Sequence, residues 1–293
     1  MPAIREASPY DPSLRAFFSS FARTTEHVLV ARTLTAPHAL IGFCEGSTRA
    51  GGVYCSRLAV AKGSRCSGVG AALLRALYAQ ARTCAPPARV AWLCTLDYQA
   101  PRYYPNVGFT AEHTLGGLRA GRVSTYFYRA LDDAASAAPA GAPPPPFAIA
   151  ALPAEGAEEA HAEAQQFVRR QFDEHAREEV GGVSGYLAFA LEAVEGEAGR
   201  EARVGALRAM SYWGLLVLSG VEVREDFRRK GLGRALVQAA LARARQEGCT
   251  MAVAEALSAS ECPSFLEAAG FARVGRVQGL EGGEEVVRLA LKL

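Results

Sequence analysis

The chain has 293 residues, half of them hydrophobic and 21% charged, as is usual for globular proteins, and its length favours two domains. The net charge of +2 gives no reason to expect a nucleic-acid partner. The N-terminus lacks the apolar stretch of a signal peptide, and no apolar run approaches the ~20 residues that span a bilayer. We therefore expect a cytoplasmic protein without a membrane partner.

The cysteines and histidines form no recognisable ligand pattern. The seven cysteines are odd in number, no pair has C-x-x-C spacing, and the five histidines lie in no H-x₃-H or H-E-x-x-H motif. Such a distribution disfavours a zinc site and a disulfide framework. We predict no metal and a reducing compartment.

The first half reads as mixed α/β. Its apolar runs and helical periodicities predict, in chain order, strands at 27–33, 38–45 and 53–61, a helix at 70–83, a strand at 89–95, a short helix near 101–107 and a strand at 123–130. A glycine-bearing turn joins the third strand to the long helix. A strand, glycine turn, helix and strand therefore form the centre of this half.

A low-complexity segment follows at 132–146, with four consecutive prolines. Such a sequence favours a stiff polyproline II rod over a packed element. We interpret it as a linker between an N-terminal domain, 1–131, and a C-terminal domain, 147–293.

The second half repeats the order of the first. We predict a helix at 155–172, strands at 186–194, 203–212 and 213–223, a helix at 232–246, a strand at 250–256, a short helix at 263–269 and a strand at 284–291. The first half is about 20 residues shorter before its glycine loop, in the helical region between its first two strands. It is therefore expected to lack part of that region.

Two short motifs recur in both halves. The sequence Arg65-Cys-Ser-Gly-Val-Gly70 matches Arg228-Arg-Lys-Gly-Leu-Gly233 at an offset of 163 residues. Gly108-Phe109 matches Gly270-Phe271 at an offset of 162 residues. The same motifs in the same order and at nearly the same separation indicate tandem duplication of one domain rather than a solenoid.

Each R-x-x-G-x-G motif ends a strand and opens a helix. The first amides of a helix lack intrahelical partners, and glycines let a bound anion approach them closely. The motif therefore predicts a diphosphate site, with a simple turn as the alternative for either copy alone. Neither copy has the lysine of a P-loop, and leucine stands at the third glycine position of a Rossmann fingerprint.

The combination resembles the GNAT superfamily of acetyl-CoA-dependent N-acetyltransferases. The segment Thr95-Leu-Asp-Tyr-Gln-Ala-Pro-Arg-Tyr-Tyr104-Pro-Asn-Val-Gly-Phe109 is similar to that family's T-F-x-F-Q-A-P-x-F-Y-E-K-L-G-F variant. The stretch from Tyr212 to Gly233 resembles its strand and loop. The resemblance implies a tandem of two mixed-sheet acyl-CoA N-acyltransferase folds, monomeric because the halves already pair as a pseudo-dimer.

The resemblance also implies an acetyl-CoA site in each half. The backbone of the strand before the loop would pair with the pantetheine arm, and the loop amides would hold the diphosphate. The corresponding residues are Leu58, Val60, Arg65, Cys66, Ser67, Gly68, Val69 and Gly70 in the first half, and Val221, Val223, Arg228, Arg229, Lys230, Gly231, Leu232 and Gly233 in the second.

The family's general acid is a tyrosine four residues before the G-F glycine. This position is Tyr104 in the first half and Leu266 in the second, so we expect the first half to be catalytic and the second to bind acetyl-CoA. Pro105 follows Tyr104; a proline inside a helix removes a hydrogen bond, and this one is expected to displace the Tyr104 hydroxyl. Two carboxylates, Glu222 and Asp97, remain open as general bases acting through water.

The expected activity is transfer of an acetyl group from acetyl-CoA to a primary amine of a small molecule or peptide, with Tyr104 as general acid. One alternative is a catalytically degenerate acyl-CoA-binding tandem that acts as a sensor or interaction module. Another is a structural pseudo-dimer in which only the second half binds the cofactor. The sequence does not identify the acceptor amine.

Overall fold

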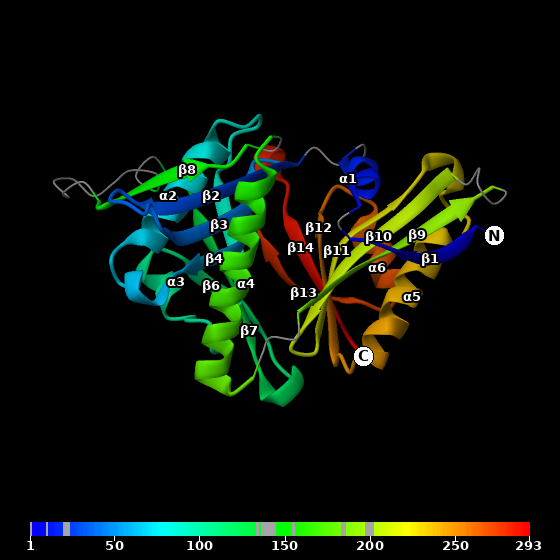
Figure 1. The fold of residues 1–293 in the computed structure, drawn as a ribbon. Helices are drawn as coiled ribbons and strands as arrows, with labels where there is room; N and C mark the ends of the chain where they lie inside the picture. Colours follow the sequence, from blue (N-terminus) through cyan, green and yellow to red (C-terminus); the bar gives the residue numbers. More distant parts are fainter. Residues whose placement is uncertain are drawn as a thin grey trace.

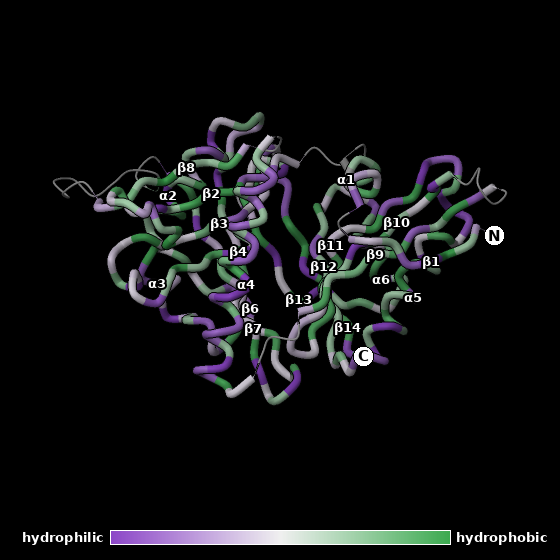
Figure 2. Tube along the Cα trace, viewed as in Figure 1, coloured by the Kyte–Doolittle hydropathy of each residue, from purple (hydrophilic) through white to green (hydrophobic). Residues whose placement is uncertain are grey.

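The computed structural model describes residues 2–9, 11–19, 24–132, 135, 145–153, 156–182, 186–196 and 202–293. Two seven-stranded mixed sheets lie side by side, each with its own helices (Figure 1). The central strands β11 and β12 lie in mostly hydrophobic stretches of the chain (Figure 2). Of the linker expected at 132–146, all but 132, 135, 145 and 146 lie outside the described residues.

The first sheet has the strand order β6-β7-β5-β4-β3-β2-β8. Its strands are β2 (Thr25–Thr33), β3 (Leu40–Arg49), β4 (Gly52–Val60), β5 (Val90–Leu96), β6 (Thr110–Leu115), β7 (Ser124–Ala130) and β8 (Phe147–Ala151). Its helices are α2 (Val69–Arg82), α3 (Tyr103–Asn106) and α4 (Glu158–Val180). Buried residues of α2 pack on β2, β3 and β4 to form the core of this half.

The second sheet has the order β1-β9-β10-β11-β12-β14-β13. Its strands are β1 (Ala3–Ala7), β9 (Leu187–Glu195), β10 (Ala202–Tyr212), β11 (Leu215–Val223), β12 (Met251–Leu257), β13 (Ala272–Val277) and β14 (Val286–Lys292). Its helices are α1 (Pro12–Ser19), α5 (Leu232–Gln246) and α6 (Cys262–Ala268). Helix α5 packs on β9, β10 and β11.

The predicted elements are present, and the mixed α/β class and the repeat are confirmed. Among the strands and α-helices that the structure describes, five were not predicted, namely β1, α1, β6, β8 and β13. Most of these are short and polar, with the partly exposed residues typical of sheet edges. Their periodicity is therefore too weak to identify them from sequence.

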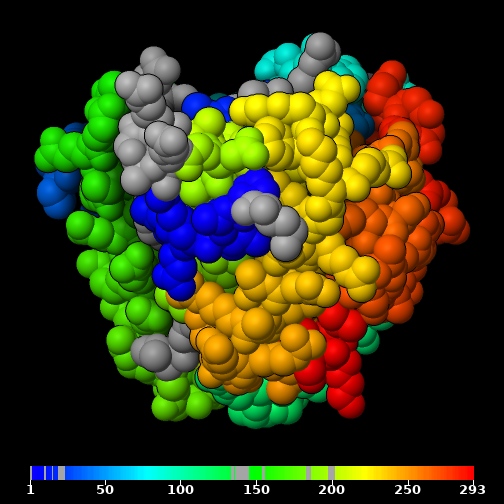
Figure 3. Space-filling view, turned by 90° about the vertical axis from the view of Figure 1, so that its right-hand side faces the viewer, coloured from blue at the N-terminus to red at the C-terminus, as the bar shows by residue number. Residues whose placement is uncertain are grey.

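The two halves exchange their first elements. Strand β1 pairs antiparallel with β9 of the second half, and β8, which follows the linker, pairs with β2 of the first half. Figure 3 shows the N-terminal residues in blue among the yellow-green and orange residues of the second half. The sheets thus divide the chain differently from the boundaries expected at 131 and 147. Two homologous edges accept similar strands, so local sequence does not show which edge a strand joins.

The exchange corrects the expectation that the first half lacks its helical region. Helix α4, which follows the linker, packs on β2, β3 and β4 through a cluster that includes Ala164, Phe167 and Val168. The much shorter α1 packs on the second sheet, where Leu14 and Phe18 contact Ala190 and Ala206. The first sheet therefore receives the longer helix from the other side of the linker.

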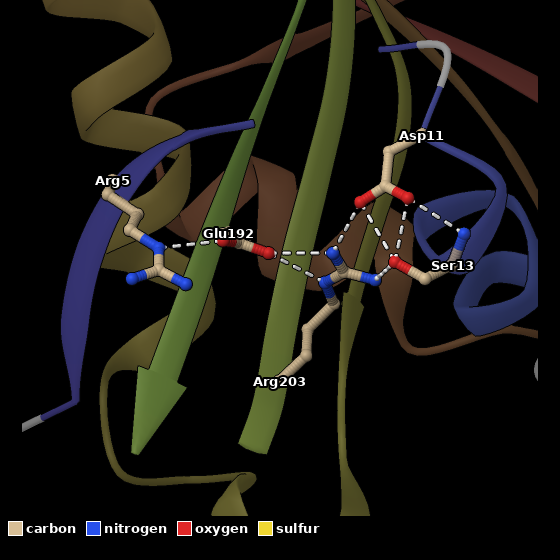
Figure 4. A network of polar contacts seen from close by, with 5 residues as sticks. All are labelled: Arg5, Asp11, Ser13, Glu192 and Arg203. Carbon is tan, nitrogen blue, oxygen red and sulfur yellow. Dashed lines mark hydrogen bonds and ion pairs between the residues drawn. The ribbon is translucent and has the colours of Figure 1, made fainter. Parts of the chain in front are cut away.

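A polar network fixes the exchanged N-terminus to the second sheet (Figure 4). The Glu192 carboxylate of β9 accepts a hydrogen bond from Arg5 Nε at 2.7 Å and one from Arg203 Nε at 2.8 Å. Arg203 also donates to Asp11 Oδ2 at 3.0 Å and to Ser13 Oγ at 3.1 Å. Burial opposes ionisation of Glu192, but the hydrogen bonds from the two arginines outweigh it and lower its pKa.

This network predicts a pH-dependent stability. A carboxyl group whose pKa is lowered by folding stabilises the protein above its unfolded pKa, and loses that contribution as the pH falls through the folded value. We expect Glu192→Gln to be less stable than wild type at pH 7, with a difference that shrinks as the pH falls below the ordinary glutamate value of 4.5. Urea denaturation between pH 7 and pH 3 measures it.

The control for this prediction is Asp226→Asn, since Asp226 pairs with Arg224 on the exposed surface. Exposed pairs contribute little, so this variant should match wild type. A stability difference for Glu192→Gln that stayed constant down to pH 3 would contradict the assigned role of its charge.

The halves also contact each other through a buried ion cluster. Arg288 of β14, 1% exposed, lies 2.8 Å from Glu255 of β12 and 2.5 Å from Glu112 of β6. Trp92 Nε1 of β5 donates to Glu255 at 2.9 Å. Because a buried charge is costly without its partners, these contacts favour one relative placement of the two sheets.

The contacts between the two halves occur in equivalent pairs. The amide of Arg119 donates to the carbonyl of Trp213 at 2.9 Å, and the amide of Glu281 donates to the carbonyl of Ala50 at 3.0 Å. The second contact corresponds to the first with the halves interchanged. The two halves are therefore related as the subunits of a symmetric dimer are. Among the described residues, no helix is both long and apolar enough to cross a bilayer.

Candidate functional site

In each sheet, two neighbouring parallel strands diverge. Strands β4 and β5 pair only where Gly52–Tyr54 faces Val90–Trp92, although β4 continues to Val60 and β5 to Leu96. Strands β11 and β12 pair over Leu215–Leu218 and then separate. Within the part of the chain that the structure describes, the far ends of β4 and β11 therefore have one edge without a strand partner.

The predicted pantetheine residues lie on these open edges. The amide of Ala61 donates to the carbonyl of Ile41 at 2.9 Å, so backbone groups alternate from there along β4. By this alternation Leu58 and Val60 direct their backbone groups away from β3, towards the divergence. The matching bond of Arg224 to Val204, also 2.9 Å, places Val221 and Val223 in the same way on β11.

Two equivalent loops follow these strands. Gly68 and Gly231 precede α2 and α5 with φ of 83° and 82°, and Cys66 and Arg229 have φ of 61° and 60°. Within the described residues, no hydrogen-bond partner is present for the backbone amides of 66–71 or of 229–234. Each loop thus offers consecutive free amides at a helix N-terminus, which suits a diphosphate.

The loop arginines have a structural contact as well as a charge. Arg65 Nε donates to the carbonyl of Val60 at 3.4 Å, and Arg228 Nε donates to the carbonyl of Val223 at 3.0 Å. Both side chains join the loop to the preceding strand and are exposed. Their remaining guanidinium nitrogens stay available for an anion.

Of the other predicted loop residues, some present only backbone amides to the loop and others also present a side chain. Val69 and Leu232 are 1% and 4% exposed, so only their amides face the loop. Ser67 Oγ donates to the carbonyl of Ser64 at 2.6 Å. Lys230 is exposed, with Nζ 5.2 Å from the Phe227 ring centroid.

The second glycine of each loop faces an aromatic side chain. A Cβ at Gly70 would lie 2.8 Å from the Tyr103 hydroxyl, and one at Gly233 would lie 3.4 Å from the Phe265 ring. A side chain at position 70 would therefore displace the Tyr103 hydroxyl, whereas one at position 233 would make an ordinary contact with Phe265.

Tyr104 lies beside Tyr103 on α3 and is half-buried. Its ring centroid is 5.8 Å from that of Phe109 and 5.5 Å from that of Phe127. Burial, followed by the nearby thiol of Cys55, raises the pKa of Tyr104 well above its usual value. Its hydroxyl is therefore protonated at neutral pH, as a general acid requires.

Pro105 removes no hydrogen bond from α3, contrary to the expectation from sequence. The helix is a single turn, Tyr103–Asn106, and Pro105 is its third residue. An amide in the first turn has no intrahelical acceptor, so proline removes no hydrogen bond there.

The second half lacks this hydroxyl. Leu266 is 1% exposed in the core, and Glu261 forms a surface pair with Arg229 at 2.5 Å. Burial raises the pKa of Glu222 on β11, and the charge of Arg228 partly offsets this effect. In the first half, Asp97 instead pairs with Arg122 at 3.2 Å.

Two further residues lie near the first divergence but were not predicted. Gln171 and His175 belong to α4, far along the sequence from Tyr104. His175 Nε2 lies 2.9 Å from the carbonyl of Tyr98, directly after β5. No motif marks them, and only the exchange of α4 across the linker brings them to the first sheet.

Comparison with known proteins agrees with the repeat. The profile described as the acetyltransferase (GNAT) domain matches residues 24–111, and that of the acetyltransferase (GNAT) family matches residues 152–271. No curated protein matches the chain at a significant level.

Several solved structures are similar to part of the chain. One, described as an acetyltransferase from Agrobacterium tumefaciens, is 20% identical, with 48% of this chain and 96% of that chain covered and a TM-score of 0.40. The ribosomal-protein-S18-alanine N-acetyltransferase of Escherichia coli is 22% identical over 36% of this chain and 68% of its own, with a TM-score of 0.31. A Bacillus subtilis acetyltransferase solved with CoA is 20% identical over 36% of this chain and 77% of its own, also with a TM-score of 0.31.

Both halves thus carry the divergent strands, the glycine loop and a match to the same family. The sequence resemblance is confirmed on each side of the linker. The chain belongs to the GNAT family of acetyltransferases, a family of acyl-transfer enzymes, and contains two of its domains in tandem.

Proposed function

We propose that the protein is an N-acetyltransferase that transfers an acetyl group from acetyl-CoA to a primary amine of a small molecule or peptide. The observation that carries the proposal is the pair of glycine loops, each with consecutive free amides beside a divergent strand edge. Such amides match a diphosphate, and the open edge matches an amide-bearing arm such as pantetheine.

In this proposal the first half is catalytic. The amine nitrogen loses a proton to a base and attacks the thioester carbon, the C–N bond forms, the C–S bond breaks, and the departing sulfur takes a proton from the Tyr104 hydroxyl. In the second half the equivalent residue is Leu266, which cannot donate a proton to the departing sulfur. The second half is therefore proposed to bind acetyl-CoA.

A negative charge introduced into each loop tests the two sites. Gly68→Asp and Gly231→Asp place a carboxylate beside the free amides, and aspartate tolerates positive φ and caps helices. A Cβ at either glycine meets no atom within 4 Å. We expect each variant to lose one of two acetyl-CoA sites in calorimetry, with an affinity loss of roughly 10–100-fold at that site, the size of a lost charged hydrogen bond.

The neutral variants Gly68→Asn and Gly231→Asn are the controls, because they have the same shape without the charge. They should retain most of the affinity. A loss of binding in the asparagine variants as large as in the aspartate variants would refute the diphosphate assignment. So would a wild-type protein that does not bind acetyl-CoA. Binding without transfer to any amine would favour the alternative function as an acyl-CoA sensor.

A further inference from the structure

Helix α4 crosses the opening between the ends of β4 and β5. The Lys62 ammonium, just after β4, lies 2.8 Å from the Glu178 carboxylate. One turn earlier, His175 Nε2 lies 2.9 Å from the carbonyl of Tyr98, just after β5. The last turns of α4 therefore join the two strand ends where the strands have separated.

At this place α4 carries two hydrogen-bond acceptors without partners. Among the described residues, neither His175 Nδ1 nor Gln171 Oε1 has one, and both atoms are buried. Gln171 is itself only 7% exposed. The two residues are four apart, so they are neighbours on one face of the helix.

The hydrogen bonds of His175 Nε2 and Gln171 Nε2 show that His175 Nδ1 and Gln171 Oε1 are acceptors. A carbonyl only accepts, so His175 Nε2 carries the hydrogen and Nδ1 keeps a free lone pair. Gln171 Nε2 donates to Glu174 at 3.2 Å, so Oε1 is the free acceptor. Buried acceptors are costly without donors, and a primary amine supplies N–H groups for both.

We propose that His175 is the general base of the first half and that Gln171 orients the acceptor amine. The proposal rests on the proposed function and adds the acceptor side of its site. A neutral amine donates one N–H to Gln171 Oε1 and another to His175 Nδ1. As the C–N bond forms and the C–S bond breaks, the amine proton passes to Nδ1, and the sulfur receives the Tyr104 proton.

Tyr98 positions this base, and the second half positions Tyr98. Trp213 Nε1, in the turn before β11, donates to the Tyr98 hydroxyl at 2.9 Å. The Tyr98 ring lies 6.0 Å from the His175 ring and 5.6 Å from the Trp213 ring, between centroids. The catalytic half therefore takes its base from across the linker and part of its support from the other sheet.

The charges around His175 come from three elements. On α4 these are Glu174 and Glu178, and Glu178 interacts electrostatically with Lys62, Arg65 and His175. On the β5 side, Asp97 pairs with Arg122 next to Tyr98. Acidic and basic groups therefore both surround His175, and the difference in pH profile between wild type and a His175 variant isolates the contribution of this histidine.

The test is His175→Gln. A glutamine amide at this position is able to keep the donor to the Tyr98 carbonyl while the base is lost. With spermidine, lysine and an alanine-initiated peptide as acceptors, we expect kcat to fall about 10²–10⁴-fold, the usual contribution of a general base. Acetyl-CoA affinity should not change, and the rise of kcat/KM with pH should disappear.

The matched control is His161→Gln. His161 lies on the same helix and also places Nε2 near a carbonyl, that of Pro153 at 2.8 Å, but this hydrogen bond is exposed and lies at the other end of α4. Its kcat and pH profile should equal those of wild type. A His175→Gln variant that kept kcat within twofold and kept the pH dependence would overturn the proposal.

A second variant separates the base from a structural role. Imidazole added to His175→Ala should restore part of kcat, whereas pyrazole, a ring of similar shape and much lower basicity, should not. Failure of rescue in a folded variant that still binds acetyl-CoA counts against His175 as base. A wild-type protein that acetylates none of the three amines and does not bind acetyl-CoA would instead refute the proposed function itself.

Discussion

Replacing Tyr104 by phenylalanine is expected to lower kcat about 10²–10⁴-fold, because the departing thiolate then has no proton donor. The pKa of Tyr104 is raised by burial, so the hydroxyl keeps its proton at the pH of the reaction. Phenylalanine preserves the ring contacts with Phe109 and Phe127. Steady-state release of CoA at saturating acetyl-CoA measures the effect.

The control for this change is Tyr128→Phe, since Tyr128 lies on β7 and is 36% exposed. It should leave kcat unaltered. Unchanged turnover in Tyr104→Phe, together with a loss in Tyr103→Phe, would transfer the proton-donor role to the neighbouring residue that faces Gly70.

Leu14→Ala is expected to lower the free energy of unfolding by about 2–5 kcal/mol, as for other fully buried leucines. Leu14 is 0% exposed and packs in the cluster with Ala190 and Ala206 of the second sheet. The loss therefore weakens the attachment of the N-terminus to the second half. Urea denaturation of the full chain measures the loss, with Leu34→Ala, at an exposed residue, as a nearly neutral control.

Hydrogen exchange locates the same effect. Strand β1 pairs with β9 over Ala3–Ala7, so Leu14→Ala should speed amide exchange in β9, far away in sequence. Faster exchange in β2 with no change in β9 would mean that α1 packs on its own half, and would contradict the exchange of elements.

Much of the repeat unit was predictable because its signals are local. The strand, glycine turn and helix around Gly68 and Gly231 depend on residues that are close in sequence. The family resemblance supplied Leu58, Val60, Val221 and Val223, and strand alternation directs their backbone groups to the open edge. Helix α5 has the predicted bounds, Leu232–Gln246.

The effect of Pro105 was not predictable in the same way. Its consequence depends on where α3 begins, and helix ends are poorly defined by sequence. Once Tyr103 is the first residue, proline occupies a position where no hydrogen bond is lost.

By itself, the sequence determined the duplicated α/β unit, the two glycine loops and the presence of the general-acid tyrosine in only the first half. Each of these features depends on residues that are close together in the sequence. Only the tertiary structure decided which sheet receives β1, β8, α1 and α4. Equivalent edges of two homologous sheets compete for the same strands, and the choice depends on long-range packing. That choice brings Gln171 and His175 of α4 to the divergence of the first half.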